Sequence, residues 1–224
     1  MESDPTRRFC CDEDLARIGC DGAGAAGDLE RWRQEGPRPE TRELLDVLIG
    51  EGVGGARLLD IGAGVGAVHV SLLEAGAASA VDVDASREYL AVAAAEVDRR
   101  GLTGRVDYRY GDVVALADDL PQVDVVTADS VICCYPYLPE LLAAAVRSGP
   151  RLVGLTYPQD RWWQRAWMHV MNGAWTVLRQ PDRWFIHRHA RVDRLLAKAG
   201  YALIHDGGSW HWRVAVYRRQ ASVG

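Results

Sequence analysis

The stretch LLDIGAGVGAV, residues 58–68, places three glycines two residues apart after a short aliphatic run that contains an acid. Glycine loses more conformational entropy on folding than any other residue, so this cluster needs a structural reason. The residues before it have the pattern of a buried strand, and those after it have the spacing of a helix that ends at Gly76. Glycines at such a turn let a polar group of a ligand lie against backbone N–H groups. The sequence therefore predicts a ligand-binding turn.

Strand and helix patterns alternate along the chain on either side of this turn. Strands are predicted at ARLLDIG, ASAVDVD, RVDYRYGD, VDVVTAD and RLVGLTY, with helical patterns between most of them. Residues 159–189 interrupt the alternation as an insertion, and YALIHDGGSWHWRVAVYRR then reads as two strands joined by a glycine turn. This order predicts an α/β fold with a doubly wound, mostly parallel seven-stranded sheet and an antiparallel C-terminal hairpin.

The composition is that of one globular domain. The chain has 224 residues, of which 48% are hydrophobic and 25% charged, enough for a sizeable core. Residues 1–36 are glycine-rich and are predicted to be a flexible lead-in with one helix near residues 28–34, and residues 37–224 a single domain. No apolar run reaches the roughly 18 residues of a membrane helix, and the N-terminus lacks the apolar segment of a secretory signal. We expect a cytoplasmic protein.

The cysteines predict neither a disulfide framework nor a metal site. Their number is odd and no C-x-x-C spacing occurs, so reduced structural thiols are expected. The five positions are Cys10, Cys11, Cys20, Cys133 and Cys134.

The glycines alone leave two kinds of ligand open. Gly62, Gly64 and Ala67 also fit the G-x-G-x-x-G/A pattern of dinucleotide-binding turns, and an acid 20 or 22 residues after Gly62 suits a ribose in either case. Three features disfavour a nicotinamide dinucleotide. Asp60 would repel a pyrophosphate but could meet an ammonium group, the Gly-Asp pair at residues 111–112 could accept from an adenine amino group, and the C-terminal hairpin is unusual for a nicotinamide domain.

From about residue 40 to residue 219 the chain resembles the class I S-adenosylmethionine-dependent methyltransferases, whose glycine motif LLDIGAGVG matches. The resemblance implies S-adenosylmethionine as the cofactor. It implies that Asp60 lies near the methionine amino group, directly or through water. It also implies that the turn admits the methionine moiety, through Gly62, Ala63, Gly64 and Gly66.

The same resemblance implies residues for the nucleoside half of the cofactor. Asp84, followed by Ala85, would bind both ribose hydroxyls, and Asp82 is its rival for that role. Asp112 and the backbone N–H of Val113 would read the adenine. These positions follow the second and third predicted strands.

The acceptor side is expected beyond the fourth and fifth strands. The resemblance implies that Asp129 and Ser130 lie by the methyl group and the acceptor. The insertion holds five of the eight tryptophans together with five arginines. It could form a flat apolar slot with arginines for carboxylates. Alternatively, Trp163, Trp167 and Val170 form one buried helix face.

A narrower resemblance concerns the acceptor. The order of DSVICCYPY, LTYP and a tryptophan-bearing insertion ending in FIHRH is similar to that of magnesium-protoporphyrin O-methyltransferases, which esterify a porphyrin propionate. Cys134 stands where that group has a histidine. Tyr135, Tyr157 and His187 are the catalytic candidates, His187 as a general base. Packing roles for the tyrosines and a surface position for His187 remain open, and a carboxylate acceptor would need no base.

The predicted function is transfer of a methyl group from S-adenosylmethionine to a small aromatic or carboxylate-bearing acceptor, at oxygen. One alternative is an NAD(P)-dependent oxidoreductase. Another is a nucleic-acid methyltransferase or binder that stacks bases on the insertion. The net charge of −5 and the absence of an N-P-P-[YF] sequence after the fourth strand count against nucleic acid.

Overall fold

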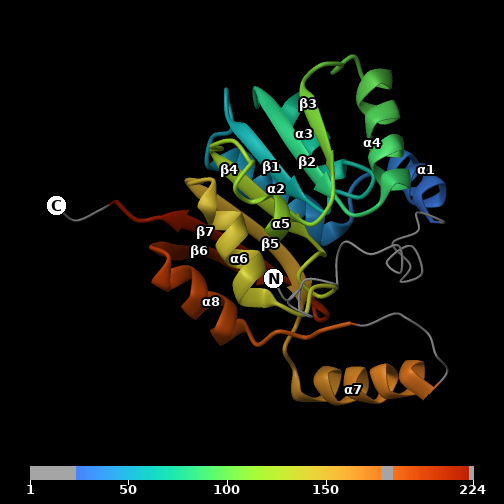
Figure 1. Ribbon diagram of the computed structural model, residues 1–224, viewed down its shortest axis with the longest axis vertical. Helices are drawn as coiled ribbons and strands as arrows, with labels where there is room; N and C mark the ends of the chain where they lie inside the picture. Colours follow the sequence, from blue (N-terminus) through green and yellow to red (C-terminus); the bar gives the residue numbers. More distant parts are fainter. Residues whose placement is uncertain (1–23, 178–183, 222–224) are drawn as a thin grey trace, which may run out of the picture.

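The computed structural model describes residues 24–177 and 184–221, so Cys10, Cys11 and Cys20 lie outside the described residues. A seven-stranded sheet forms the centre (Figure 1). Its spatial order is β3-β2-β1-β4-β5-β7-β6, with β7 antiparallel to both neighbours and the other pairs parallel. The strands are β1 Arg57–Ile61, β2 Ser79–Asp84, β3 Val106–Tyr110, β4 Val125–Asp129, β5 Leu152–Pro158, β6 Tyr201–Gly208 and β7 Trp212–Arg219. The predicted fold class is confirmed.

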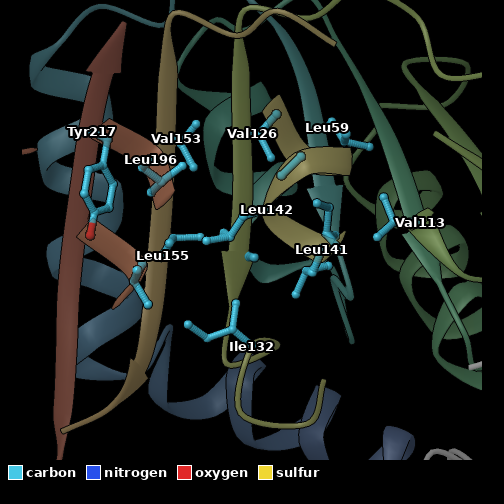
Figure 2. Close-up of a cluster of buried hydrophobic side chains, with 14 of the residues drawn as sticks. Leu59, Val113, Val126, Ile132, Leu141, Leu142, Val153, Leu155, Leu196 and Tyr217 are labelled. Carbon is cyan, nitrogen blue, oxygen red and sulfur yellow. The ribbon is translucent and has the colours of Figure 1, made fainter. Parts of the chain in front are cut away.

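Helices cover both faces of the sheet. They are α1 Ala25–Glu35, α2 Pro39–Gly50, α3 Ala67–Glu74, α4 Arg87–Arg99, α5 Val113–Leu116, α6 Leu138–Arg147, α7 Trp162–Val177 and α8 His189–Lys198. Because side chains alternate along a strand, β1 sends Leu59 toward α6 and Leu58 toward α2. Figure 2 shows the first of these layers, where Leu141, Leu142 and Leu196 pack on the sheet. Two apolar layers therefore hold the parallel strands, as doubly wound folds require.

The N-terminal part differs from the expectation of a flexible lead-in. The helix predicted near residues 28–34 is present as α1, and it packs on α4. Buried Glu96 accepts hydrogen bonds from Arg99, Arg100 and Arg33, and these guanidinium groups lower the pKa of Glu96 to about 2. Arg100 also lies over the ring of Trp32, 4.5 Å from its centroid. Helix α1 is thus packed onto the sheet domain, and residues 1–23 of the predicted lead-in lie outside the described residues.

The insertion contains α7, which stands apart from the layered body in Figure 1. The expectation of a buried face is wrong for two of its three residues: Trp167 is 61% exposed and Val170 64% exposed. Trp163 makes an edge contact with the ring of His211, at 6.2 Å between centroids. None of the described helices is long and apolar enough to cross a membrane.

Candidate cofactor and acceptor site

Backbone angles and close packing explain why the turn after β1 contains glycines. Gly62, Gly64 and Gly66 have φ angles of 60°, 57° and 83°, a region that side chains disfavour. A Cβ at Gly62 would come within 2.7 Å of Val131 Cγ2, and one at Gly66 within 2.7 Å of His69 Nε2. Glycine therefore lets this turn adopt its backbone conformation and pack closely against Val131 and His69.

A cavity of about 720 Å³ lies above that turn. It sits where the strand order reverses between β1 and β4, the usual ligand crevice of a doubly wound sheet. Its walls come from the glycine turn, from the ends of β2 and β4, and from the segment joining α1 to α2. Of the expected site residues, the lining includes Gly62, Ala63, Gly64, Asp84, Ala85, Asp129, Ser130 and Tyr135.

Asp84 presents a positioned carboxylate to the cavity. Its Oδ1 accepts from the Ser86 N–H at 2.8 Å, and its Oδ2 accepts from the Gly64 N–H at 3.1 Å. Burial raises the pKa of Asp84, and these backbone hydrogen bonds oppose the shift. The carboxylate is therefore tied to the glycine turn and keeps lone pairs for vicinal hydroxyl groups.

Asp82 lies one pleat deeper on the same strand and outside the cavity lining. It is fully buried, and neither carboxylate oxygen has a hydrogen-bond partner among the described residues. Burial, reinforced by the charges of Asp60 and Asp84, raises its pKa well above the usual value. Of the two rivals for the ribose, the structure brings Asp84 to the cavity.

Asp60 is buried beneath the turn. Its Oδ1 accepts from the Thr127 hydroxyl at 2.7 Å, and its Oδ2 accepts from the backbone N–H and the Nδ1 of His69, at 3.2 and 3.0 Å. It is absent from the cavity lining, as is Gly66. In this arrangement Asp60 holds the first turn of α3 in place, and any contact with a ligand would be indirect.

Asp112 and Val113 lie at the start of α5. Asp112 caps the helix by accepting from the Val114 N–H at 3.0 Å, and it accepts from the Tyr135 hydroxyl at 2.9 Å. Neither Asp112 nor Val113 lines the cavity, whereas Tyr135 does. A hydrogen bond thus links Tyr135, a candidate for the acceptor side, to Asp112, a candidate for contact with the adenine.

Asp129 is the most heavily hydrogen-bonded acid at the cavity. It accepts from Thr41 Oγ1 at 2.6 Å, from Arg38 Nη2 at 3.2 Å and from Thr156 Oγ1. The adjacent Ser130 has a φ of 65°, the one positive φ outside glycine in the described chain, and Arg38 donates to its hydroxyl at 2.5 Å. Strained backbone of this kind concentrates at functional sites.

Arg38 and Thr41 were not among the predicted site residues. Both lie at the start of α2, about 90 residues from Asp129 in the chain, where Arg38 precedes the helix and Pro39 occupies its first turn. Arg38 also lies over the ring of Trp212, 5.4 Å from its centroid. No local pattern signals such a long-range contact.

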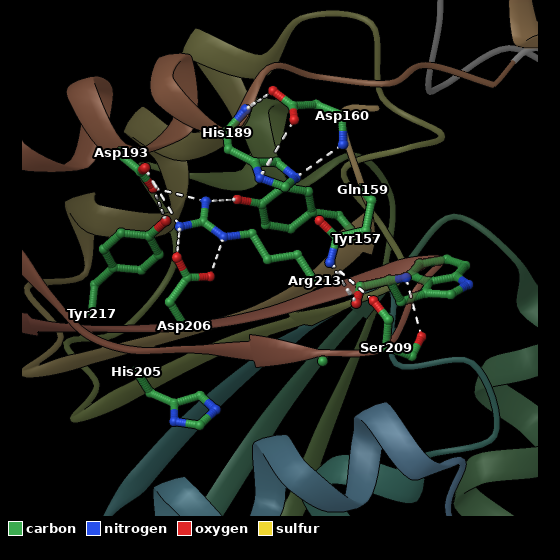
Figure 3. Close-up of polar contacts among 12 residues, drawn as sticks. Tyr157, Gln159, Asp160, His189, Asp193, His205, Asp206, Ser209, Arg213 and Tyr217 are labelled. Atoms are coloured by element: carbon green, nitrogen blue, oxygen red, sulfur yellow. Dashed lines mark hydrogen bonds and ion pairs between the residues drawn. The ribbon is translucent and has the colours of Figure 1, made fainter. Parts of the chain in front are cut away.

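Tyr157 is fully buried and does not line the cavity. Figure 3 shows its hydroxyl facing the guanidinium group of Arg213. Its hydroxyl accepts from Arg213 Nη1 at 2.6 Å, and burial raises its pKa to about 12. Arg213 also binds Asp193 and Asp206. The structure therefore places Tyr157 in a polar network of the core rather than beside an acceptor.

His187 lies on the chain segment that returns from the insertion. Its Nε2 donates to the Tyr135 carbonyl at 2.9 Å, and burial lowers its pKa. His187 is absent from the cavity lining, but Trp184 from the same segment is present, as is the exposed Cys134. Cys133 is buried, whereas Cys134 is exposed.

Comparisons with known proteins agree with this geometry. Residues 59–149 match the family described as "Methyltransferase domain". The release factor glutamine methyltransferase of Gloeobacter violaceus is 34% identical over 119 residues, 52% of this chain and 40% of that protein. The nocamycin O-methyltransferase of Saccharothrix syringae is 35% identical over 125 residues, 54% of this chain and 44% of that protein. The chain thus spans less than half the length of these two relatives.

Among solved structures, the magnesium protoporphyrin IX methyltransferase of Synechocystis with bound S-adenosylhomocysteine superposes with a TM-score of 0.68. The two are 17% identical, and the alignment covers 91% of this chain and 98% of that one. The whole chain therefore has the fold of the class I S-adenosylmethionine-dependent methyltransferases, and residues 59–149 match their methyltransferase domain. The residues present fit the cofactor S-adenosylmethionine, because a glycine-rich turn and an acid at the end of the next strand line one cavity.

Proposed function

We propose that this chain methylates an oxygen of a small acceptor that carries a carboxylate on a planar or apolar body. The observation that carries the proposal is the continuity of the cavity. It runs from the glycine turn and Asp84, past Asp129, to Arg38 and Trp184. Its volume of about 720 Å³ suits small molecules, whose pockets measure roughly 300–1,000 Å³.

In this proposal the cofactor half of the cavity is the end near β1 and β2. The backbone of Gly62, Ala63 and Gly64 receives the methionine moiety, and Asp84 accepts hydrogen bonds from the ribose hydroxyls. S-adenosylmethionine supplies an electrophilic methyl group on a sulfonium. The protein's task is to hold acceptor and methyl in line and to exclude water.

In the proposal, Asp112, which accepts from the Tyr135 hydroxyl, and Val113 complete the contacts with the nucleoside. Asp60 acts through the turn by fixing α3. Asp60 has no direct contact with the cofactor in this proposal, because its two oxygens already accept three hydrogen bonds.

The acceptor half is bounded by arginines and aromatic rings. Arg38 and Arg42 line the cavity together with Tyr135 and Trp184. A guanidinium group matches a carboxylate with two parallel hydrogen bonds. Asp129 and Ser130 fix the position of Arg38 at the end of β4. This combination favours an acidic acceptor with a flat body.

The absence of a histidine from the described cavity lining also supports a carboxylate acceptor. The Nε2 of His187 is engaged by the Tyr135 carbonyl, and the Tyr157 hydroxyl is buried. A carboxylate is already ionised at neutral pH, so its methylation needs no general base. We assign His187 the role of fixing the return segment of the insertion. A cytoplasmic location remains part of the proposal.

The test has two stages. Calorimetry with S-adenosylhomocysteine measures the cofactor site, and we expect one binding site per chain. Release of S-adenosylhomocysteine from S-adenosylmethionine is then measured with aromatic carboxylic acids, with tetrapyrrole acids and with glutamine-containing proteins. Methyl transfer to the protein amides and to none of the acids would contradict the proposed acceptor. Failure to bind S-adenosylhomocysteine would contradict the cofactor site.

A further inference from the structure

Helix α7 turns its apolar side to solvent. Trp162 is 76% exposed, Trp167 61% and Val170 64%. Soluble helices normally bury such a stripe against the body of the protein. No residue between 161 and 173 is fully buried, and α7 packs closely on no other element in the described chain.

Two polar side chains of α7, together with Trp163, contact the rest of the chain. Asn172 Nδ2 donates to the Trp184 carbonyl at 2.7 Å, and its Oδ1 accepts from the Trp184 N–H at 3.2 Å. Gln164 Nε2 reaches the His211 carbonyl at 3.5 Å. In this orientation Trp162, Trp167 and Val170 face solvent, which is the reverse of a core-facing amphipathic helix.

A second exposed tryptophan region lies next to the start of α7. Trp210, in the turn between β6 and β7, is 60% exposed. Arg161 lies over its ring, 3.7 Å from the centroid. The exposed apolar residues of α7 and of this turn are called the arm patch: Trp162, Trp167, Val170 and Trp210.

Helix α7 carries a positive charge, although the chain as a whole carries −5. Residues 159–189 contain five arginines and two aspartates, and α7 contains no acid. Asp160 faces His189, accepting from its N–H at 3.1 Å. Arg161, stacked on Trp210, and Arg165, within α7, lie beside the exposed tryptophans.

We propose that the arm patch binds the surface of an anionic lipid bilayer. Tryptophan concentrates at the level of lipid headgroups because its ring is apolar and its N–H is polar. A helix with an outward apolar side and flanking arginines lies in that interface, and the arginines meet lipid phosphates. Contact is peripheral, with α7 and the β6–β7 turn as two shallow anchors.

The test uses the full chain and vesicles of phosphatidylcholine with or without phosphatidylglycerol. We expect co-sedimentation with the phosphatidylglycerol vesicles, a blue shift of tryptophan emission and weaker binding at high salt. Trp162→Ser/Trp167→Ser should lower the apparent partition coefficient at least about tenfold. Ile49→Ser/Ile204→Ser is the matched control, because it removes two exposed apolar side chains elsewhere. It should bind vesicles as the wild type does.

Three results would overturn the proposal. The first is no binding to anionic vesicles. The second is binding that the tryptophan double variant retains in full. The third is a concentration-dependent dimer, seen by sedimentation velocity and lost in the same variant, which would assign the arm patch to a second copy of the chain. Circular dichroism of each variant checks folding, and none of these measurements depends on methyl transfer.

Discussion

Replacement of Asp84 by alanine tests the proposed cofactor site most directly. The two oxygens of Asp84 are held by the Ser86 and Gly64 N–H groups, and the side chain lines the cavity. If the carboxylate accepts the ribose hydroxyls, alanine removes charge-assisted hydrogen bonds worth about 1.5–3 kcal/mol each. The loss of at least ~1.5 kcal/mol raises the Kd for S-adenosylhomocysteine at least about tenfold.

Isothermal titration calorimetry at neutral pH measures this change, with thermal melting as the check on folding. Asp82→Asn is the control, because Asp82 lies two residues away on the same strand but outside the cavity. Its affinity for S-adenosylhomocysteine should equal that of the wild type. An unchanged Kd for Asp84→Ala in a folded protein would refute the assignment, and a loss in Asp82→Asn alone would transfer the role to Asp82.

Three further predictions concern stability and the turn. Asp82→Asn should raise the melting temperature at pH 7. Because burial raises the pKa of Asp82 in the folded protein, the stability of the wild type falls as the pH rises above 3.8. The difference in melting temperature between variant and wild type should therefore shrink toward pH 3.8 in a pH series of melts. Glu96→Gln should cost about 1–3 kcal/mol in urea unfolding at pH 7, and the difference should disappear as pH falls from 4.5 toward 2, where wild-type Glu96 protonates. Gly62→Ala should lower the free energy of unfolding by about 1–2 kcal/mol because of the φ of 60°, and further because the new Cβ meets Val131. It should also weaken S-adenosylhomocysteine binding, measured by the same calorimetric titration.

The sequence by itself determined the fold class and the position of the cofactor turn. Both rest on local signals: strand and helix periods differ, and glycine adopts the positive φ angles found at residues 62, 64 and 66 without the strain that a side chain adds. The helix near residues 28–34 was also visible in its pattern. Its packing on α4 was not, because Glu96 and Arg33 are 63 residues apart in the chain.

The tertiary structure decided which candidate residues meet. Asp82 and Asp84 have the same local pattern, yet only the residue at the end of β2 reaches the cavity, because Asp82 lies one pleat deeper. Tyr157 and Tyr135 each precede a proline, but Arg213 holds Tyr157 inside the core. The spacing of the α7 tryptophans indicates one helix side and cannot tell whether that side faces protein or solvent. That direction depends on contacts such as Asn172 with Trp184, and contacts between distant residues form only when the whole chain has folded.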